Sequence, residues 1–233
     1  MDSGLLEVGR QISHVLEDPQ ISPLYVAHFV AQAQKELLQM PRADWPETVR
    51  RVFSALEKAG VAHVSRIYHV ASDYYSWPLY ERALCMSAPS PAHMCKSVLL
   101  ENKRWRPEHP GSRYYCVMVQ YVHSVNTTMM ADFVRALDGD AIARKHFNFR
   151  LTSPETTFEM TGYDKNGVSP FGVYVDVPVI LCESITRLQP PVFWLGAGHV
   201  DYKLAMPADH FIRATKSLVA DISLPATNLD DEQ

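Results

Sequence analysis

The sequence lacks the features that mark secreted, membrane-spanning and metal-binding proteins. It has four cysteines in 233 residues, and none of them is spaced as a pair of metal ligands. No apolar run is long enough to cross a bilayer, and no basic stretch followed by an apolar one opens the chain. The histidines also lack a metal-ligand spacing such as H-E-x-x-H. We therefore expect a cytoplasmic protein with reduced thiols, no membrane association, and no metal or other cofactor.

Positive charge is scarce as well. With 22 Lys and Arg against 26 Asp and Glu, the net charge is −4, so no overall field draws the chain to nucleic acid. A nucleic-acid role would need a local basic patch. The candidates are Lys103, Arg104, Arg106 and Arg113 in one loop, with Arg144, Arg213 and Lys216 elsewhere. The alternative is that these charges only form a solvated face. We expect the chain to recognise a small part of its partner, or to bind it with help.

The first sixty residues are predicted to be helical. Pro23 is placed in the first turn of a helix that runs through Met40. A second helix, with apolar residues at helical spacing, ends at Gly60. Residues 1–60 are therefore predicted to form a helical hairpin in front of the main domain. This extension is expected to serve as a packing element or as a docking surface for a partner.

After Val61 the hydrophobic pattern changes to that of strands. Short β-like runs occupy residues 64–70, 97–101, 114–122, 145–151, 172–177, 192–197 and 201–206, and helical stretches open at Pro78, Pro91, Pro154 and Pro207. These strands are too many and too irregularly spaced for a doubly wound sheet. The predicted fold is α/β (α+β) over residues 61–225, with a mixed, partly closed β-sheet or barrel surrounded by helices. Residues 226–233 are predicted to be an acidic tail.

Lys96 is the first candidate for chemistry. It leads into the apolar run Ser97-Val98-Leu99-Leu100, which is typical of a buried strand. Burying an ammonium group costs free energy unless a partner compensates for the lost water. The alternative is a lysine whose stem packs on apolar surface while its charge stays in solvent.

Two glycine-containing turns are the other candidates. Residues 161–172 contain three glycines and Pro170, which fix a backbone path that can aim N–H groups at a carbonyl oxygen. Alternatively, this segment only connects two strands. Gly198 allows close backbone approach, and His199 and Asp201 follow it at the start of a strand. Nothing here completes a Ser-His-Asp or Cys-His-Asn arrangement.

Taken in this order, the three elements resemble the YbaK/ProX-type aminoacyl-tRNA deacylases, to which the insertion domain of bacterial prolyl-tRNA synthetase is related. The resemblance covers about residues 62–223. Cys95-Lys96-Ser97 resembles the segment that holds the family's catalytic lysine. Thr161-Gly162-Tyr163 together with Gly167-Val168-Ser169-Pro170-Phe171-Gly172 resembles the clearest signature of the family. The stretch Arg66-Ile67-Tyr68-His69 resembles the eukaryotic branch, which often has a helical N-terminal extension.

The resemblance implies hydrolysis of the ester between an amino acid and the terminal ribose of a mischarged tRNA. Lys96 would be the catalytic lysine, and Gly167 and Pro170 would shape the loop that holds the aminoacyl carbonyl. A protonated Lys96 would hold the terminal phosphate or ribose, or offset negative charge; a neutral one would act as a base. We favour the charged form. The nucleophile would be water, or the substrate's own side chain if it carries a thiol.

Other residues would surround the substrate. Tyr68 would line the pocket, with His69 as the alternative, and Asp201 would be an acidic residue near it. The remaining substrate-binding assignments are Ser169, Gly172, Gly198 and His199. The implied partner is aminoacyl-tRNA, and residues 1–60 would dock to an aminoacyl-tRNA synthetase or multi-synthetase complex. The alternative function is a non-catalytic tRNA- or synthetase-binding subunit.

Overall fold

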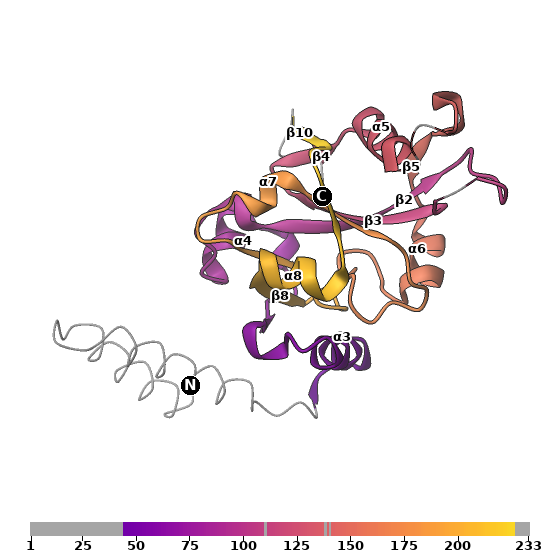
Figure 1. Cartoon of the computed structure of the whole chain (residues 1–233). Helices are drawn as coiled ribbons and strands as arrows, with labels where there is room; N and C mark the ends of the chain where they lie inside the picture. Colours follow the sequence, from indigo (N-terminus) through magenta and orange to yellow (C-terminus); the bar gives the residue numbers. More distant parts are fainter. Residues whose placement is uncertain (1–43, 110, 138, 140, 227–233) are drawn as a thin grey trace, which may run out of the picture. The chain divides into compact units, whose positions relative to one another are not determined.

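The computed structural model describes residues 44–109, 111–137, 139 and 141–226, and the structural statements below concern these residues (Figure 1). Residues from Pro46 onward belong to one compact unit. The first predicted helix, through Met40, and residues 227–233 of the predicted tail lie outside the described residues. This unit begins at Pro46, before the predicted start of the main domain at residue 61.

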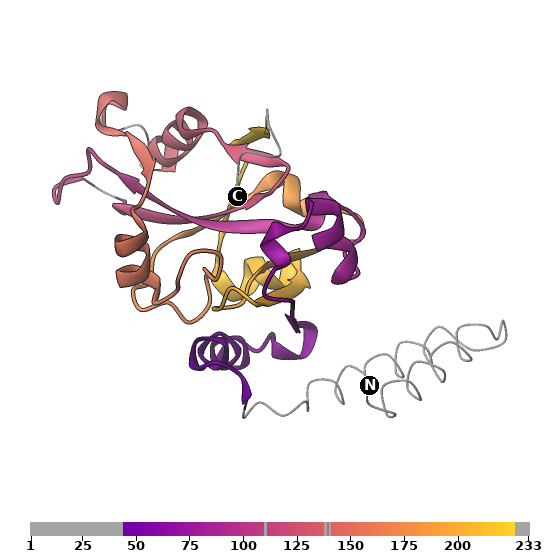
Figure 2. The same cartoon turned by 180° about the vertical axis from the view of Figure 1, so that it is seen from behind.

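A five-stranded mixed sheet runs through this unit (Figures 1 and 2). Its order is β5 (Phe149–Leu151), β2 (Cys95–Asn102), β3 (Tyr114–Gln120), β6 (Val179–Cys182) and β9 (Leu218–Ala220). β2 is antiparallel to β3 and β5, whereas β3 with β6, and β6 with β9, are parallel. β3 and β6 are almost wholly buried, which explains their nearly continuous apolar sequences, because such strands need apolar side chains on both faces.

A second, antiparallel sheet has the order β1 (Arg66–His69), β8 (Tyr202–Pro207) and β7 (Val192–Gly196). A bridge between Met94 and Trp194 brings the start of β2 beside β7. A two-stranded ribbon pairs β4 (His123–Val125) with β10 (Ser223–Pro225). The predicted mixed α/β class is confirmed. The described strands form separate open sheets, so the sheet is not closed into a barrel.

Helices pack around these sheets (Figure 1). They are α3 (Glu47–Lys58), α4 (Leu79–Cys85), α5 (Thr127–Leu137), α6 (Pro154–Thr161), α7 (Glu183–Thr186) and α8 (Ala208–Thr215). α6 begins as its sequence predicts: Pro154 occupies the first turn, and the Ser153 hydroxyl accepts a hydrogen bond from the Thr156 N–H (3.2 Å). The stretch at Pro91 forms only a 3-10 turn, Pro91–His93.

The strand predicted at residues 172–177 is irregular in the structure. The Val175 N–H donates to the Met160 carbonyl near the end of α6 (2.9 Å) and not to a neighbouring strand. Gly172, with φ +69, turns the chain against α3, because a Cβ there would lie 2.9 Å from the Arg51 carbonyl oxygen. The segment is therefore held against α3 and α6 and is not paired in a sheet.

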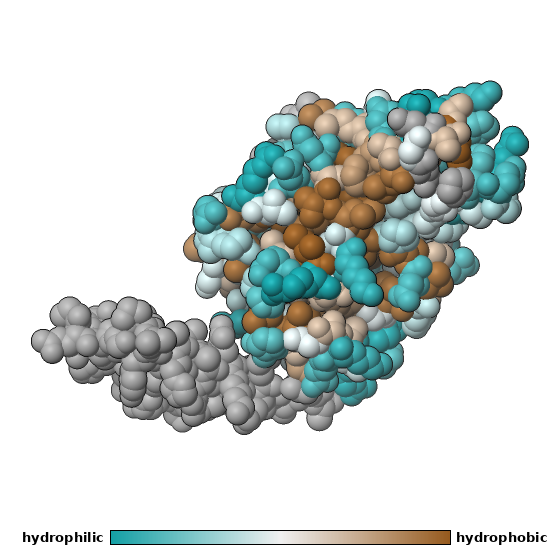
Figure 3. Space-filling view, in the orientation of Figure 1, coloured by the Kyte–Doolittle hydropathy of each residue, from teal (hydrophilic) through white to brown (hydrophobic). Residues whose placement is uncertain are grey.

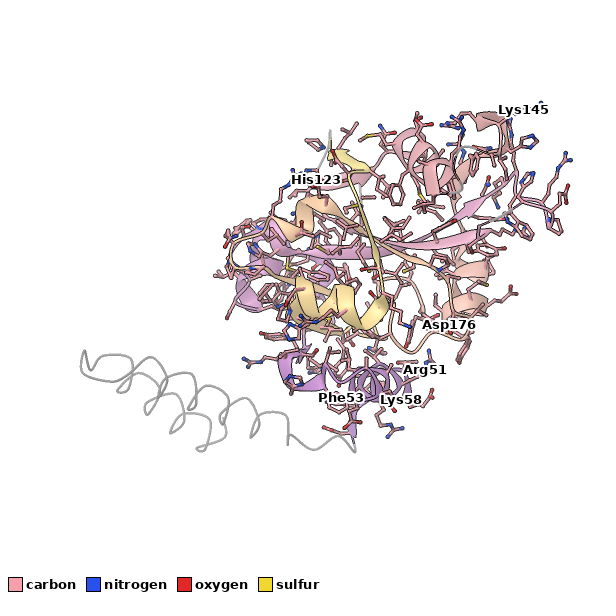
Figure 4. The ribbon with its side chains drawn as sticks, viewed as in Figure 1. Arg51, Phe53, Lys58, His123, Lys145 and Asp176 are labelled. Carbon is pink, nitrogen blue, oxygen red and sulfur yellow. The ribbon has the colours of Figure 1, made fainter. Side chains whose placement is uncertain are left out.

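The second predicted helix, α3, packs into the main core. Val49, Val52 and Leu56 have no exposed surface, and Gly60 follows the helix with φ +71. Arg51, labelled in Figure 4, lies 4.4 Å from the Tyr163 ring centroid and 4.5 Å from that of Tyr174. Its guanidinium also donates to the carbonyls of Thr161 and Gly162 (3.3 and 2.8 Å). α3 thus fastens the glycine-containing segment 161–172 from outside.

Candidate functional site

A cavity of about 310 Å³ opens where the start of β2 approaches β7 and β8. Its volume is in the range of small-molecule sites. The segment before Val168 and the N-terminal end of α6 complete the wall. The residues that line the cavity include Tyr74, Tyr75, Cys95, Lys96, Tyr121, Thr152, Thr157, Lys165, Asn166, Val168, Trp194, Gly196 and Lys203. The structure thus brings Lys96 and the Gly167 turn to one cavity, from segments some seventy positions apart.

Lys96 is the second residue of β2, where it pairs with Val119 on β3. Its amine lies 5.7 Å from the centroid of the Tyr121 ring. Desolvation lowers the pKa of Lys96 to about 8, so the amine is mostly charged at neutral pH and loses its proton just above it. Lys96 also lines a second cavity of about 480 Å³, which extends along β2 to Phe149 and Arg150. The lysine therefore stands between two cavities.

A second lysine, Lys203, faces the same cavity from β8. It is only 4% exposed, and its amine donates to the carbonyls of Val200 (2.5 Å) and Tyr202 (3.3 Å). The amine lies 5.2 and 4.8 Å from the ring centroids of Tyr74 and Tyr75. Desolvation lowers the pKa of Lys203 to about 7, although the charge of Asp201 opposes this shift. Sequence reasoning missed this residue, although a lysine between apolar strand positions is the same signal that singled out Lys96.

Aromatic side chains form much of the remaining wall. The Tyr75 hydroxyl donates to the Asn166 carbonyl (3.0 Å) and so joins the wall to the glycine turn. Trp194 is 5% exposed, and its indole N–H has no hydrogen-bond partner within the part of the chain that the structure describes. Burial raises the pKa of Tyr121, which keeps its hydroxyl neutral. These aromatic residues line the cavity, whereas Tyr68 and His69 do not, and the sequence did not predict them.

The turn at residues 165–168 is fixed by β7. A Cβ on Gly196 would lie 2.4 Å from the Val168 carbonyl oxygen, so only glycine permits this close approach. The Gly167 carbonyl accepts from the Gly198 N–H (2.8 Å), and the Gly167 N–H donates to the Asp164 carbonyl (3.0 Å). The Gly167 N–H is therefore already used within the turn, and Val168, the next residue, lines the cavity.

The second half of the turn faces away from both cavities. Ser169 has no exposed surface, and its hydroxyl accepts from the Phe171 N–H (3.3 Å). The Tyr163 hydroxyl donates to the carbonyls of Phe171 and Gly172 (2.7 and 3.0 Å). Pro170 and Gly172 line neither cavity. The structure thus places Ser169, Pro170 and Gly172 where they shape the turn from behind.

The predicted residues after β7 form a separate turn. Gly198, with φ +90, packs against α3, since a Cβ would lie 2.7 Å from the Thr48 carbonyl oxygen. The His199 Nδ1 accepts from the Asp201 N–H (3.1 Å), and the His199 ring lies 5.7 Å from that of Tyr202. None of these side chains lines either cavity. Asp201 reaches the site only through its charge, which acts on the pKa of Lys203.

Tyr68 and His69 lie on β1, across from Lys203 and Tyr202 of β8. The Arg66 guanidinium lies over the Tyr68 ring, 4.9 Å from its centroid. The centroids of the His69 and Tyr202 rings are 4.8 Å apart. Neither residue lines either of the two cavities described above. Their pairing with β8 makes them supports for the strand that holds Lys203.

Metal-binding clusters and membrane-spanning helices are both absent from the described ranges. No group of three or more His, Cys, Asp or Glu side chains there could hold a metal ion. No described helix is long and apolar enough to span a membrane. Cys95, beside Lys96, is 3% exposed, and burial raises the pKa of its thiol well above the usual value. A buried thiol of this kind is a poor nucleophile, because the thiolate is the reactive form.

Known structures share this architecture. The crystal structure of "a putative trans-editing enzyme for prolyl tRNA synthetase" matches with a TM-score of 0.62 and 20% identity, over 78% of this chain and 99% of the other. A hypothetical protein, APE2540, matches with a TM-score of 0.56 and 19% identity, over 75% and 99% of the two chains. At these identities the likeness concerns the fold. A search of curated proteins found no match.

The sequence itself gives the family. Residues 82–214 match the model of the aminoacyl-tRNA editing domain. This stretch is more than half of the chain and contains Lys96, the Gly167 turn and Lys203. The chain belongs to the aminoacyl-tRNA editing domain family. The predicted resemblance is thereby confirmed, as is the expectation of a role in editing.

Proposed function

We propose that this protein is a trans-editing hydrolase that deacylates mischarged aminoacyl-tRNA at the 3′ end. The observation that supports the proposal is the cavity that Lys96, Val168 and the buried Lys203 all line, within the stretch that matches the editing-domain family. The amines of Lys96 and Lys203 both line this cavity, and when they are protonated they make its wall electropositive in a chain of net charge −4. Such a wall suits a reaction that develops negative charge on a carbonyl oxygen.

The reaction needs no covalent intermediate on the protein. Water adds to the aminoacyl carbonyl, the bond to the ribose oxygen breaks, and that oxygen takes up a proton, which leaves free amino acid and tRNA. Protonated Lys96 offsets charge on the carbonyl oxygen or holds the terminal ribose or phosphate, and the Val168 N–H is a second donor. The buried Cys95 thiol takes no part.

The aromatic wall gives this site a way to select its amino acid. Tyr75 and Trp194 are large, and Tyr75 is held by its hydrogen bond to Asn166. A cavity of about 310 Å³ that also has to admit a ribose leaves room for a small amino acid side chain. Size exclusion of this kind discriminates weakly between side chains that differ by one methylene, by about 1–3 kcal/mol. We therefore propose that small side chains are accepted and large ones are rejected.

Deacylation of a panel of charged tRNAs tests the proposal. tRNA charged with alanine, cysteine or serine is incubated with wild type, with Lys96→Ala and without protein, and the surviving ester is measured over time. The proposal expects at least one ester to be lost faster with wild type than without protein, and this gain to disappear in Lys96→Ala. Binding of tRNA with every ester left intact would instead favour the non-catalytic binding subunit.

A further inference from the structure

A cluster of positive side chains lies at the far end of β2 from Lys96. The cluster, called the basic tip below, consists of Lys103, Arg104, Arg106, Arg113, Arg144, Lys145 and Arg150. Figure 4 labels Lys145 at this end of the molecule, and Figure 3 shows that the same corner is mainly hydrophilic. The sequence suggested a patch in the loop after β2 but left Arg144 apart. In the structure, the loop after β2 and the segment that contains Arg144 lie at the same end of the molecule.

A buried asparagine holds the two halves of the basic tip together. Asn102, at the end of β2, is 3% exposed, and its amide donates to the His146 carbonyl (3.0 Å). Its side-chain oxygen accepts from the N–H groups of Arg104 and Asn148 (3.1 and 2.9 Å). The Arg104 guanidinium donates to the Lys145 carbonyl (2.6 Å). The spacing of these positive charges is therefore set by the fold.

Only part of this positive charge is neutralised by neighbours. Glu101 pairs with both Lys103 and Arg113, and Asp132 pairs with Arg144 (2.7 Å). Arg106 has only a long, exposed contact with Glu108 (4.0 Å). Within the described ranges, Arg104, Lys145 and Arg150 have no carboxylate partner. The pKa of His146 is lowered by desolvation and then by the positive charges around it, among them those of Lys145, Arg106 and Arg104.

The basic tip is continuous with the candidate active site. Arg150 lines the second cavity, which Lys96 also lines. Lys96 and Asn102 are the second and last residues of β2, so they are roughly 20 Å apart along the strand. A polyanion with its end at Lys96 would therefore run along this cavity to Arg150 and on to Arg104 and Lys145. Arginine presents a planar fork of donors that matches phosphate, which favours a phosphodiester chain over scattered carboxylates.

We infer that the basic tip binds the phosphate backbone of RNA, namely the acceptor end of the tRNA whose terminal nucleotide enters at Lys96. This inference rests on the proposed function for the identity of the RNA. It explains how a chain of net charge −4 can hold a polyanion: a local surface supplies the charge that the whole molecule lacks.

Salt-dependent binding of uncharged tRNA tests the inference. The variant Arg104→Gln/Arg106→Gln/Lys145→Gln removes three exposed charges that line neither cavity, and Arg187→Gln/Arg213→Gln/Lys216→Gln removes the same number and kinds of charge elsewhere. Each lost phosphate contact lowers the slope of log K against log salt by about 0.7–0.9. We expect the first variant to lose about 2 units of slope, and to bind at least tenfold more weakly at low salt. The second variant should behave as wild type.

The binding result separates this inference from the proposed function. If the salt slope of the first variant equals that of wild type, or if the second variant loses as much slope as the first, the inference that the basic tip binds RNA is overturned. Hydrolysis of an aminoacyl-adenosine ester, which is too short to reach the tip, should be equal in wild type and in the first variant, while the KM for charged tRNA rises. If wild type hydrolyses neither substrate, the proposed function fails. The salt slopes then still show whether the basic tip binds RNA. The single variant Lys145→Glu, which reverses one exposed charge, should likewise lower the salt slope and weaken the binding of tRNA.

Discussion

The role proposed for the charged amine of Lys96 predicts how the rate of deacylation depends on pH. Because desolvation lowers the pKa of Lys96 to about 8, about nine tenths of the amine is protonated at pH 7 and about one tenth at pH 9. If the protonated form stabilises the carbonyl oxygen, the enzymatic rate follows this fraction. The rate should therefore fall about tenfold between pH 7 and pH 9.

The assay is single-turnover deacylation from pH 6 to 9.5, with spontaneous hydrolysis subtracted at each pH. Lys203 complicates the profile, since its pKa is lowered to about 7 and it lines the same cavity. Lys203→Met removes that titration with little change in volume. In this variant the profile should retain a single fall centred near pH 8.

Two results would refute the reasoning. An enzymatic rate that rises through pH 8 means that the neutral amine of Lys96 acts as a base, contrary to the role assigned to its charge. A profile that is flat in Lys203→Met means that the charge of Lys96 does not enter the rate-limiting step at all.

Three further predictions concern stability. Removing residues 1–60 should prevent folding, because the buried side chains of α3 contribute about 1.5–3 kcal/mol each. Gly196→Ala should lower the free energy of unfolding by about 1–3 kcal/mol in urea titrations, because its methyl group would meet the Val168 carbonyl. Lys203 binds fewer protons folded than unfolded between its lowered pKa of about 7 and the ordinary 10.5. Wild type should therefore gain up to about 1.4 kcal/mol per pH unit over Lys203→Met as pH rises from 7 to 9.

Each of these has a contrary outcome. A folded 61–233 fragment would show that α3 is dispensable. An unchanged urea midpoint for Gly196→Ala would show that the turn can move away from β7. A stability difference between wild type and Lys203→Met that does not vary with pH would show that Lys203 is not desolvated in the folded state.

The sequence predicted the elements whose signals are local. Ser153-Pro154 began α6, an apolar stripe at helical spacing marked α3, and long apolar runs marked β2, β3, β7 and β8. The three- and four-residue strands β4, β6, β9 and β10 were missed, because their pairing partners come from distant segments and their own sequences are too short to show a period.

The candidate site was predictable to a similar extent. Lys96 and the Gly167 turn stood out because a lysine beside a buried strand and a cluster of glycines are both unusual locally. Which side chains face the cavity depends on strand register and on the bridge between β2 and β7, which no local pattern shows. Tyr75, Trp194 and Lys203 were therefore missed.

Loss of activity on removing the Lys96 amine is the most direct test of the central claim. The measurement is the single-turnover deacylation rate of the best substrate among alanyl-, cysteinyl- and seryl-tRNA, with Lys58→Ala as a control for loss of an exposed lysine. We predict that Lys96→Ala loses roughly 10²-fold or more and approaches spontaneous hydrolysis, while Lys58→Ala keeps the wild-type rate. Folded Lys96→Ala that hydrolyses as fast as wild type would contradict the account.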